Sequence, residues 1–186
     1  KGKFVVVEVL FYDKEIKNNT PMYSFSTLTS CQHKEFPHIS AYIKSAYSAL
    51  GIREGASHVE LKVTERNGEK IIYLIEIAPR LSGTASPAAI NEVQGVTQTS
   101  LLVDSIIHPQ RFEAISREAI LPRKSLAQIF LYSPLAGILK KEPGPHNFSH
   151  LKTFYQLHFY YKEGRTLPIT TDITNFPGYV YLVGSQ

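Results

Sequence analysis

Two strand-like segments joined by a tight turn constrain the fold of this chain more than any other feature. Residues 58–66 and 69–78 are rich in β-branched and aliphatic side chains, and the dipeptide Asn67-Gly68 between them is typical of β-hairpin turns. Both strands must direct an apolar face toward one core, so their alternation predicts which residues share that face. We expect the apolar face to comprise Val59, Leu61, Val63, Ile71, Tyr73, Ile75 and Ile77.

The length of the turn decides the register of this hairpin. A two-residue Asn-Gly loop would pair Leu61 with Leu74 and break the shared apolar face. A loop one residue longer, formed by residues 67–69 with a bulge, pairs Leu61 with Ile75 and keeps that face intact. We therefore expect the longer loop.

In the expected register, two acids face each other across the hairpin. Glu60 lies directly opposite Glu76, with β-carbons about 5 Å apart. Like charges in this arrangement destabilise a sheet, and a cation between them relieves the repulsion. A hard divalent ion that prefers carboxylate oxygens, Mg²⁺ above all, fits this pair. The alternative is that both glutamates are solvated on an exposed face, where the repulsion is weak.

The residues that follow the second strand predict an anion site. Pro79-Arg80 ends the strand and brings a guanidinium toward the carboxylates. A loop of small residues then leads into a helix, with Ser86 at the N-cap and Pro87 at the first helical position. Small residues, a helix N-terminus and an arginine favour binding of an anion. Together with a metal ion, they point to phosphate chemistry.

The sequence around the two glutamates resembles a known enzyme family. Residues 58–60 and 74–83 read His-Val-Glu and Leu-Ile-Glu-Ile-Ala-Pro-Arg-Leu-Ser-Gly. They resemble the C-terminal half of the ATP-grasp enzymes, and most of all their carboxylate–amine ligases, such as the L-amino acid (dipeptide) ligases. A weaker resemblance covers residues 2–9, 135–139 and 177–184. The resemblance therefore extends over most of the chain, but only its central motif is specific.

The resemblance implies a phosphoryl-transfer site. Glu60 and Glu76 would be the ligands of Mg²⁺, or of Mn²⁺ in its place, that bridges the phosphates of ATP. Arg80 would be the catalytic cation that stabilises the transferring phosphoryl group or the acyl phosphate. The family usually has an asparagine as a further metal ligand two residues after the second glutamate. Here that position is Ala78, whose side chain offers no oxygen.

The resemblance also implies binding residues and a reaction. Ile75 would contact the adenine, although the alternation places it on the core face. Ser82 and Gly83, together with Arg80, would bind the substrate. ATP would phosphorylate a small-molecule carboxylate, and an amine would attack the acyl phosphate to form a C–N bond.

Other functions remain open from the sequence. Ala78 favours a non-catalytic module that senses a nucleotide or a metal, or an interaction domain that kept the scaffold. An ATP-grasp carboxylase or a purine-pathway enzyme would share the same central motif. A homodimer is compatible with either reading.

Composition and charge narrow the class of protein. The 186 residues are 43% hydrophobic and 19% charged, which is ordinary for a globular protein. The formal net charge is +4, but the basic residues are scattered, so we expect no nucleic-acid partner. No apolar run is long enough to span a membrane. A single cysteine, Cys31, fits a reducing compartment, so we expect a cytoplasmic protein.

The expected fold class is α+β. An ATP-grasp C-terminal lobe, an antiparallel sheet with helices on one side, would occupy residues 1–121. A small β-rich closing domain would occupy residues 122–186. The chain begins with lysine, so we expect it to lack an N-terminal lobe and to be inactive by itself.

The remaining patterns predict individual elements. Residues 3–11 and 22–30 are expected to be two strands of a hairpin around a polar loop at 13–21. Apolar residues at helical spacing predict a helix over residues 39–50. Further helices are expected at 87–93 and 97–107, and short strands at 125–132, 137–140, 153–161 and 179–183.

Overall fold

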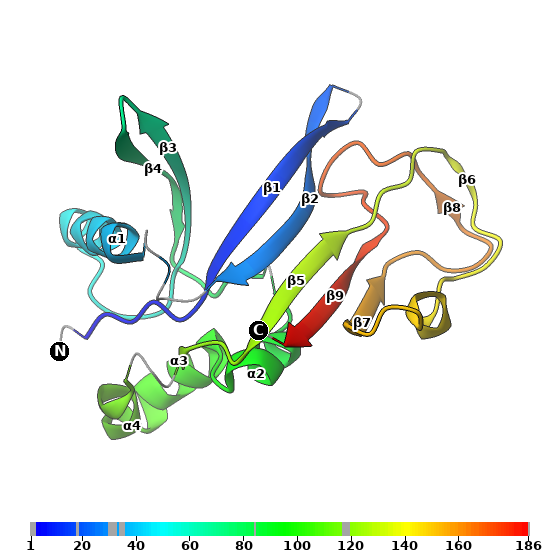
Figure 1. Ribbon diagram of the computed structural model, residues 1–186. Helices are drawn as coiled ribbons and strands as arrows, with labels where there is room; N and C mark the ends of the chain where they lie inside the picture. The colour runs from blue at the N-terminus through cyan, green and yellow to red at the C-terminus, as the bar shows by residue number, and fades with distance from the viewer. Residues whose placement is uncertain are drawn as a thin grey trace. The chain divides into compact units, whose positions relative to one another are not determined.

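The computed structural model describes residues 3–17, 19–29, 33, 36–83, 85–116 and 120–185 (Figure 1). The chain divides into two compact units. Unit 1 comprises residues 1–9 and 30–121, and unit 2 comprises residues 10–29 and 122–186. Unit 2 therefore takes in the N-terminal hairpin, which the sequence-based division at residue 121 assigned to the first lobe. That division of the chain into two functional parts stays a prediction.

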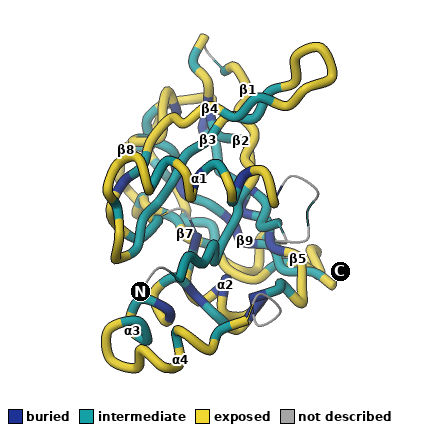
Figure 2. Tube along the Cα trace, turned by 90° about the vertical axis from the view of Figure 1, so that its left-hand side faces the viewer, coloured by how far each residue is buried: buried dark blue, intermediate teal, exposed yellow. Residues whose placement is uncertain are grey.

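The described residues of unit 1 form one β-hairpin and four α-helices. The hairpin is formed by β3 (His58–Arg66) and β4 (Glu69–Ala78), which pair antiparallel. The helices are α1 (Phe36–Leu50), α2 (Pro87–Gln94), α3 (Gln98–Ile107) and α4 (Pro109–Ala114). The last of these, α4, contains no buried residue and is largely exposed (Figure 2).

Helix α1 packs through one apolar face, and its polar groups hold the hairpin. Its buried residues, Phe36, Ile39 and Ile43, recur at helical spacing. The Tyr42 hydroxyl accepts a hydrogen bond of 3.2 Å from the backbone N–H of Leu74 in β4. The helix predicted at residues 39–50 is confirmed, and it begins three residues earlier.

The α2–α3 junction is set by its capping residues. Gly95 ends α2 in the left-handed conformation, with φ of 74°, and its N–H donates to the carbonyl of Asn91. Thr97 then caps α3 by a reciprocal pair of hydrogen bonds with Ser100. Ser86 stands at the N-cap of α2 as predicted, but its side chain makes no capping hydrogen bond. These caps explain why the predicted pair of helices breaks where it does.

Unit 2 is built on a five-stranded sheet with the order β1-β2-β5-β9-β7. Its strands are β1 (Val9–Lys17), β2 (Thr20–Thr29), β5 (Lys124–Phe130), β9 (Gly178–Ser185) and β7 (Phe154–Phe159). A separate two-stranded ladder joins β6 (Gly137–Ile138) to β8 (Thr166–Leu167), and a short 3-10 helix, η2, spans Pro145–Phe148. The first position of β9 requires glycine, Gly178, because a β-carbon there would lie 2.0 Å from the carbonyl oxygen of His158 in β7.

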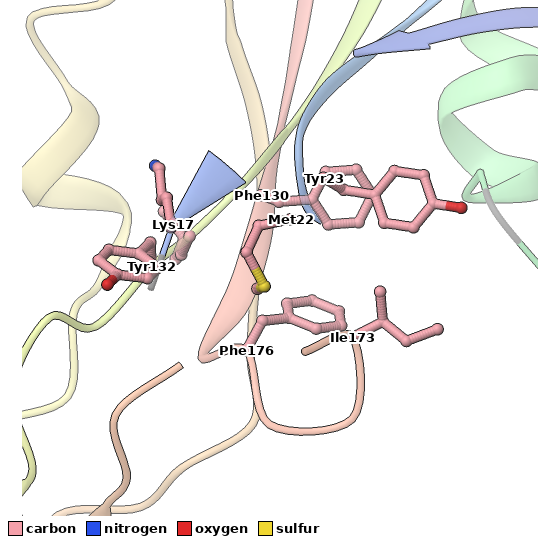
Figure 3. Close-up of a pocket in the computed structure, with 8 residues that line it drawn as sticks. Lys17, Met22, Tyr23, Phe130, Tyr132, Ile173 and Phe176 are labelled. Carbon is pink, nitrogen blue, oxygen red and sulfur yellow. The ribbon is translucent and has the colours of Figure 1, made fainter. Parts of the chain in front are cut away.

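An aromatic cluster occupies one region of unit 2. Figure 3 shows the rings of Tyr23, Phe130 and Phe176 around a small pocket of about 10 Å³, with Met22 beside them. The Phe130 ring lies 5.4 Å from that of Tyr23 and 5.5 Å from that of Phe176. Such contacts, together with burial of the rings, stabilise this end of the sheet. The pocket is too small for anything larger than a water molecule.

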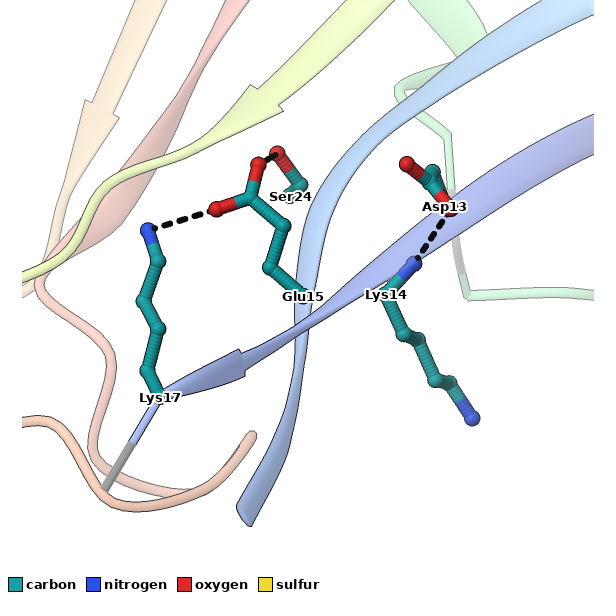
Figure 4. A network of polar contacts seen from close by, with 5 residues as sticks. All are labelled: Asp13, Lys14, Glu15, Lys17 and Ser24. Atoms are coloured by element: carbon teal, nitrogen blue, oxygen red, sulfur yellow. Dashed lines mark hydrogen bonds and ion pairs between the residues drawn. The ribbon is translucent and has the colours of Figure 1, made fainter. Parts of the chain in front are cut away.

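The exposed hairpin of unit 2 carries polar contacts (Figure 4). The Glu15 carboxylate accepts a hydrogen bond of 2.7 Å from the Ser24 hydroxyl and lies 3.4 Å from the Lys17 ammonium. These contacts lower the pKa of Glu15, with the Ser24 hydrogen bond as the largest cause. The Lys14 ammonium lies 4.6 Å from the centre of the Tyr23 ring. Exposed pairs of this kind contribute little to stability.

Two of the predicted N-terminal elements are wrong. The strand predicted at residues 3–11 begins only at Val9, and residues 3–8 have no regular structure. The polar loop predicted at 13–21 is strand as far as Lys17. β1 is an edge strand whose middle is exposed, so polar side chains are compatible with it.

The other predicted elements agree with the structure in kind, whereas α4, η2 and β8 were not predicted. The mixed α/β class with antiparallel sheets is confirmed. Among the described residues, no helix is long and apolar enough to cross a membrane. Cys31 lies outside the described residues.

Candidate functional site

The turn of the central hairpin has two residues, not three. Asn67 and Gly68 both have positive φ, 55° and 80°, which matches the tight turn that an Asn-Gly dipeptide favours. Arg66 therefore pairs with Glu69. The three-residue loop expected from the sequence is wrong.

A β-bulge in β4 restores the predicted pairing of the acids. From the turn, the ladder runs without interruption to Leu61 opposite Leu74. The register then shifts by one residue, so that Ile75 is the extra residue of a bulge and Glu60 pairs with Glu76. The predicted opposition of the two glutamates is confirmed, although the predicted pairing of Leu61 with Ile75 is wrong.

The bulge also changes which residues of β4 share the apolar face. Leu74 and Ile72 lie opposite Leu61 and Val63, and so share their face, whereas Tyr73 lies opposite Lys62. Tyr73 is 49% exposed and Ile75 is 58% exposed. Ile71 lies opposite Thr64, on the same face as Tyr73. The expectation that Ile71 and Tyr73 share the apolar face is therefore wrong, as is the expectation that Ile75 is in the core. The expected set combined residues from the two faces because it assumed unbroken alternation across the bulge.

The acid pair supplies two hard oxygen donors at one point of the hairpin. Glu60 is half-buried and Glu76 is exposed. The next pair on the same face is His58 opposite Ala78, and Ala78 is buried. Among the described residues, no group of three or more histidine, cysteine, aspartate or glutamate side chains could hold a metal ion. A divalent ion bound to these two carboxylates would therefore need its remaining ligands from water or from a phosphate.

Residues 80–83, which we call the arginine loop, follow β4 directly. The backbone N–H of Arg80 donates to the carbonyl of Ala78 at 2.8 Å, which ends the strand in a turn. The Arg80 side chain is exposed, and its Nη1 donates to the carbonyl of Leu81 at 3.0 Å. Gly83 is exposed, and Thr84 lies outside the described residues. The loop thus presents a guanidinium and a glycine to solvent.

Gln98, the first residue of α3, holds the arginine loop through both backbone groups of Ser82. The Ser82 N–H donates to Oε1 of Gln98 at 2.7 Å, and Nε2 of Gln98 donates to the Ser82 carbonyl at 3.0 Å. Gln98 also contacts Glu8, because its backbone N–H donates to one carboxylate oxygen of Glu8 at 3.1 Å. The sequence interpretation missed both Glu8 and Gln98.

Burial gives Glu8 unusual electrostatics. Desolvation raises the pKa of the Glu8 carboxyl above its ordinary value, and the hydrogen bond from the Gln98 backbone opposes this in part. Glu8 is the only acid in the apolar run Phe-Val-Val-Val-Glu-Val-Leu-Phe, residues 4–11. The position of Glu8 could have been recognised from the sequence. An acid within an apolar run must either be buried with a hydrogen-bond partner or be exposed where the apolar pattern is interrupted.

Comparisons with known proteins show what the chain is similar to. An ATP-grasp domain model matches residues 1–88, which include both glutamates and the arginine loop. Dapdiamide A synthase of Enterobacter agglomerans is 26% identical over 185 residues, which is 98% of this chain and 42% of that protein. The chain therefore spans less than half the length of this relative.

Two solved structures share the fold. An L-amino acid ligase from Bacillus licheniformis superposes with a TM-score of 0.68 at 18% identity, over 96% of this chain and 47% of that one. A phosphoribosylglycinamide synthetase from Anaerococcus prevotii gives a TM-score of 0.65 at 14% identity, over 95% of this chain and 44% of that one. At these identities the likeness shows the fold alone.

Proposed function

Because this chain carries an ATP-grasp domain, with the fold of an ATP-grasp ligase, we propose that it is the C-terminal catalytic part of an ATP-dependent carboxylate–amine ligase. ATP would transfer a phosphoryl group to a carboxylate, and an amine would then displace phosphate from the acyl phosphate. The observation that carries the proposal is the register of the hairpin, which sets Glu60 against Glu76, with the exposed Arg80 shortly after the end of β4. We also propose that the reaction depends on a metal ion and takes place in the cytoplasm.

The acid pair fits Mg²⁺ by the chemistry of its donors. Two carboxylates opposite each other on one face offer the oxygen ligands that this ion prefers, and their mutual repulsion is relieved when it binds. When bound, the ion would neutralise phosphate charge. Ala78 adds no oxygen, so Glu60 and Glu76 would have to serve any second ion as well, together with phosphate and water.

The arginine loop supplies the positive charge and the room for substrate. Arg80 presents its guanidinium beside the end of β4, where a planar fork of donors can stabilise negative charge that develops on a phosphoryl or acyl phosphate oxygen. Gly83 leaves its backbone open to close approach, because nothing lies within 4 Å of where a β-carbon would be. We assign Arg80, Ser82 and Gly83 to the substrate side of the site.

Ile75 is assigned to the adenine. This residue is the extra residue of the bulge in β4 and is 58% exposed. It is therefore available to a flat apolar ligand without loss of core packing. This exposure supports the assignment of Ile75 to the adenine.

Ala78 supports a second candidate function, a nucleotide-sensing module without turnover. Titration calorimetry of the full-length protein with Mg²⁺–ATP, together with an assay of ADP release across pairwise amino-acid mixtures, distinguishes the two. The ligase proposal predicts magnesium-dependent binding and substrate-dependent ADP release. Binding without release for every mixture would favour sensing. Absence of magnesium-dependent binding would contradict both.

Variants connect this test to the site. Arg80→Ala should lower turnover by about 100-fold with little change in ATP affinity, and Arg80→Lys should recover little because the planar fork is lost. Glu76→Gln should remove the magnesium dependence of binding. Glu65→Gln changes an exposed acid elsewhere on the same hairpin and serves as the control. Wild-type turnover in Arg80→Ala would remove Arg80 from the mechanism.

A further inference from the structure

The side-chain amide of Gln98 is committed on both of its ends. Its Oε1 accepts from the Ser82 N–H at 2.7 Å, and its Nε2 donates both to the Ser82 carbonyl at 3.0 Å and to Glu8 Oε2 at 3.4 Å. A glutamine amide has a donor end and an acceptor end that differ little in shape, so its partners decide its orientation. If this amide were rotated by half a turn, its oxygen would face two acceptors, one of them the carboxylate of Glu8. Glu8 therefore reinforces the orientation that the two backbone groups of Ser82 select for Gln98.

The same contacts pin the arginine loop on both sides of its arginine. On one side, the Arg80 N–H bonds to the carbonyl of Ala78 at the end of β4. On the other side, both backbone groups of Ser82 are held by α3. Only Leu81 lies between Arg80 and the clamped residue. The backbone from which the guanidinium extends thus has little freedom to move.

Glu8 is itself held in place. Its Oε1 accepts from the first N–H of α3, where the helix offers an unpaired donor. One residue earlier, the carbonyl of Val7 accepts from Nε2 of Gln94 at 3.3 Å, and Gln94 is almost completely buried. Residues 7–8 are therefore joined to the α2–α3 junction through hydrogen bonds from Gln94 and Gln98.

We propose that Gln98 and Glu8 are positioning residues of the phosphoryl-transfer site, which hold the arginine loop in the geometry that Arg80 needs. This inference rests on the proposed function of Arg80. Catalysis is sensitive to the placement of such a charge, because a displacement of about 1 Å can lower the rate about 100-fold. A purely structural role would lower stability without a selective loss of turnover.

The test uses two readouts on the full-length protein. Hydrogen exchange, followed by mass spectrometry on the peptide that contains residues 80–83, reports the clamp directly. Gln98→Met keeps the length of the side chain and removes its hydrogen bonds, so exchange at Ser82 should rise about tenfold. Thr99→Ala, at the next and exposed position of α3, is the matched control and should change exchange less than twofold.

Steady-state kinetics then report positioning. Gln98→Met should lower kcat about tenfold or more and change the KM for ATP by less than threefold. Glu8→Gln keeps the shape of the side chain but not the charge that orients the amide, and should produce a smaller change in the same direction. Unchanged exchange at Ser82 in Gln98→Met, or raised exchange with wild-type kcat, would overturn the proposal.

Failure of the proposed function would look different. If Arg80→Ala kept wild-type turnover, the role of Arg80 would be wrong, while the exchange at Ser82 would still show whether the clamp exists. If Arg80→Ala lost turnover and Gln98→Met kept it, the clamp alone would be rejected as a positioning device.

Discussion

The opposed pair Glu60 and Glu76 should make the hairpin less stable than a partly neutral pair would, until a divalent cation binds. At a separation of about 5 Å in water, two like charges repel by about 0.8 kcal/mol, which lies within the range of about 0.2–1 kcal/mol for cross-strand pairs. In the absence of metal, Glu60→Gln and Glu76→Gln should each raise the free energy of unfolding by up to that amount. The double variant should gain no more than either single one, because the repulsion can be removed only once.

Bound metal reverses the expected effect of Glu76→Gln on the free energy of unfolding. A ligand present at about 100 times its dissociation constant stabilises the native state by about 2.7 kcal/mol. With magnesium and ADP at such concentrations, the wild-type protein should gain this amount and Glu76→Gln should gain little of it. Urea unfolding of the four proteins of the cycle, in chelator and in magnesium with ADP, measures both effects.

The same hairpin provides a control of opposite sign. Glu65 lies directly opposite Lys70, so Glu65→Gln removes an attraction and should lower the free energy of unfolding by about 0.2–1 kcal/mol, with or without magnesium. Both effects should shrink in about 1 M salt, where the Debye length is about 3 Å. Additive effects of the two glutamate substitutions, or equal gains from magnesium in wild type and Glu76→Gln, would refute the reasoning.

Two further predictions concern the scaffold. Gly178→Ala should lower the free energy of unfolding, measured in urea, by at least about 1–3 kcal/mol, because the new β-carbon would lie 2.0 Å from the His158 carbonyl oxygen. Gly164 has positive φ but open space around it, so Gly164→Ala should lower the free energy of unfolding by less. Equal losses in the two variants would contradict the steric argument. For Glu8, burial raises the folded-state pKa above 4.5, so the stability of the wild type should fall as the pH rises from that value through the raised pKa. Glu8→Gln should lack this fall, so parallel unfolding curves of the two proteins between pH 4 and pH 8 would contradict it.

The hairpin was predictable because its signals are local. An Asn-Gly turn between two β-rich segments specifies the pairing of neighbouring residues, and so the opposition of Glu60 and Glu76 could be read from the sequence. The expected pair is right although two expectations are each wrong by one residue, because the two errors cancel. The turn is one residue shorter than expected, and Ile75 adds one residue in the bulge. Nothing in the local sequence marks that bulge, since an isoleucine fits a regular strand equally well.

The clamp on the arginine loop could not be predicted, because its parts are distant in sequence. Glu8 and Gln98 are 90 residues apart, and Ser82 and Gln98 are 16 apart. No sequence pattern around Gln98 or Ser82 indicates which residue each one contacts. The position of Glu8 within an apolar run indicated only that this acid needed a hydrogen-bond partner. Similarly, β1 was hidden because an edge strand tolerates the polar residues that are typical of a loop.

Ile75 offers a test of the nucleotide site that is independent of its charges. The side chain is 58% exposed, so Ile75→Ala should change the free energy of unfolding by less than about 0.5 kcal/mol. Ile75→Ala removes three carbons, and each buried carbon contributes about 0.8 kcal/mol. If adenine covers the exposed 58% of the side chain, their loss weakens ATP binding by about 1.4 kcal/mol, which is a tenfold loss of affinity. Mg²⁺–tripolyphosphate, which has no base, should bind wild type and Ile75→Ala equally well in titration calorimetry. Leu74→Ala, at the neighbouring residue that pairs with Leu61, should lower stability without a selective loss for ATP. Equal losses for ATP and tripolyphosphate in Ile75→Ala would place the base elsewhere.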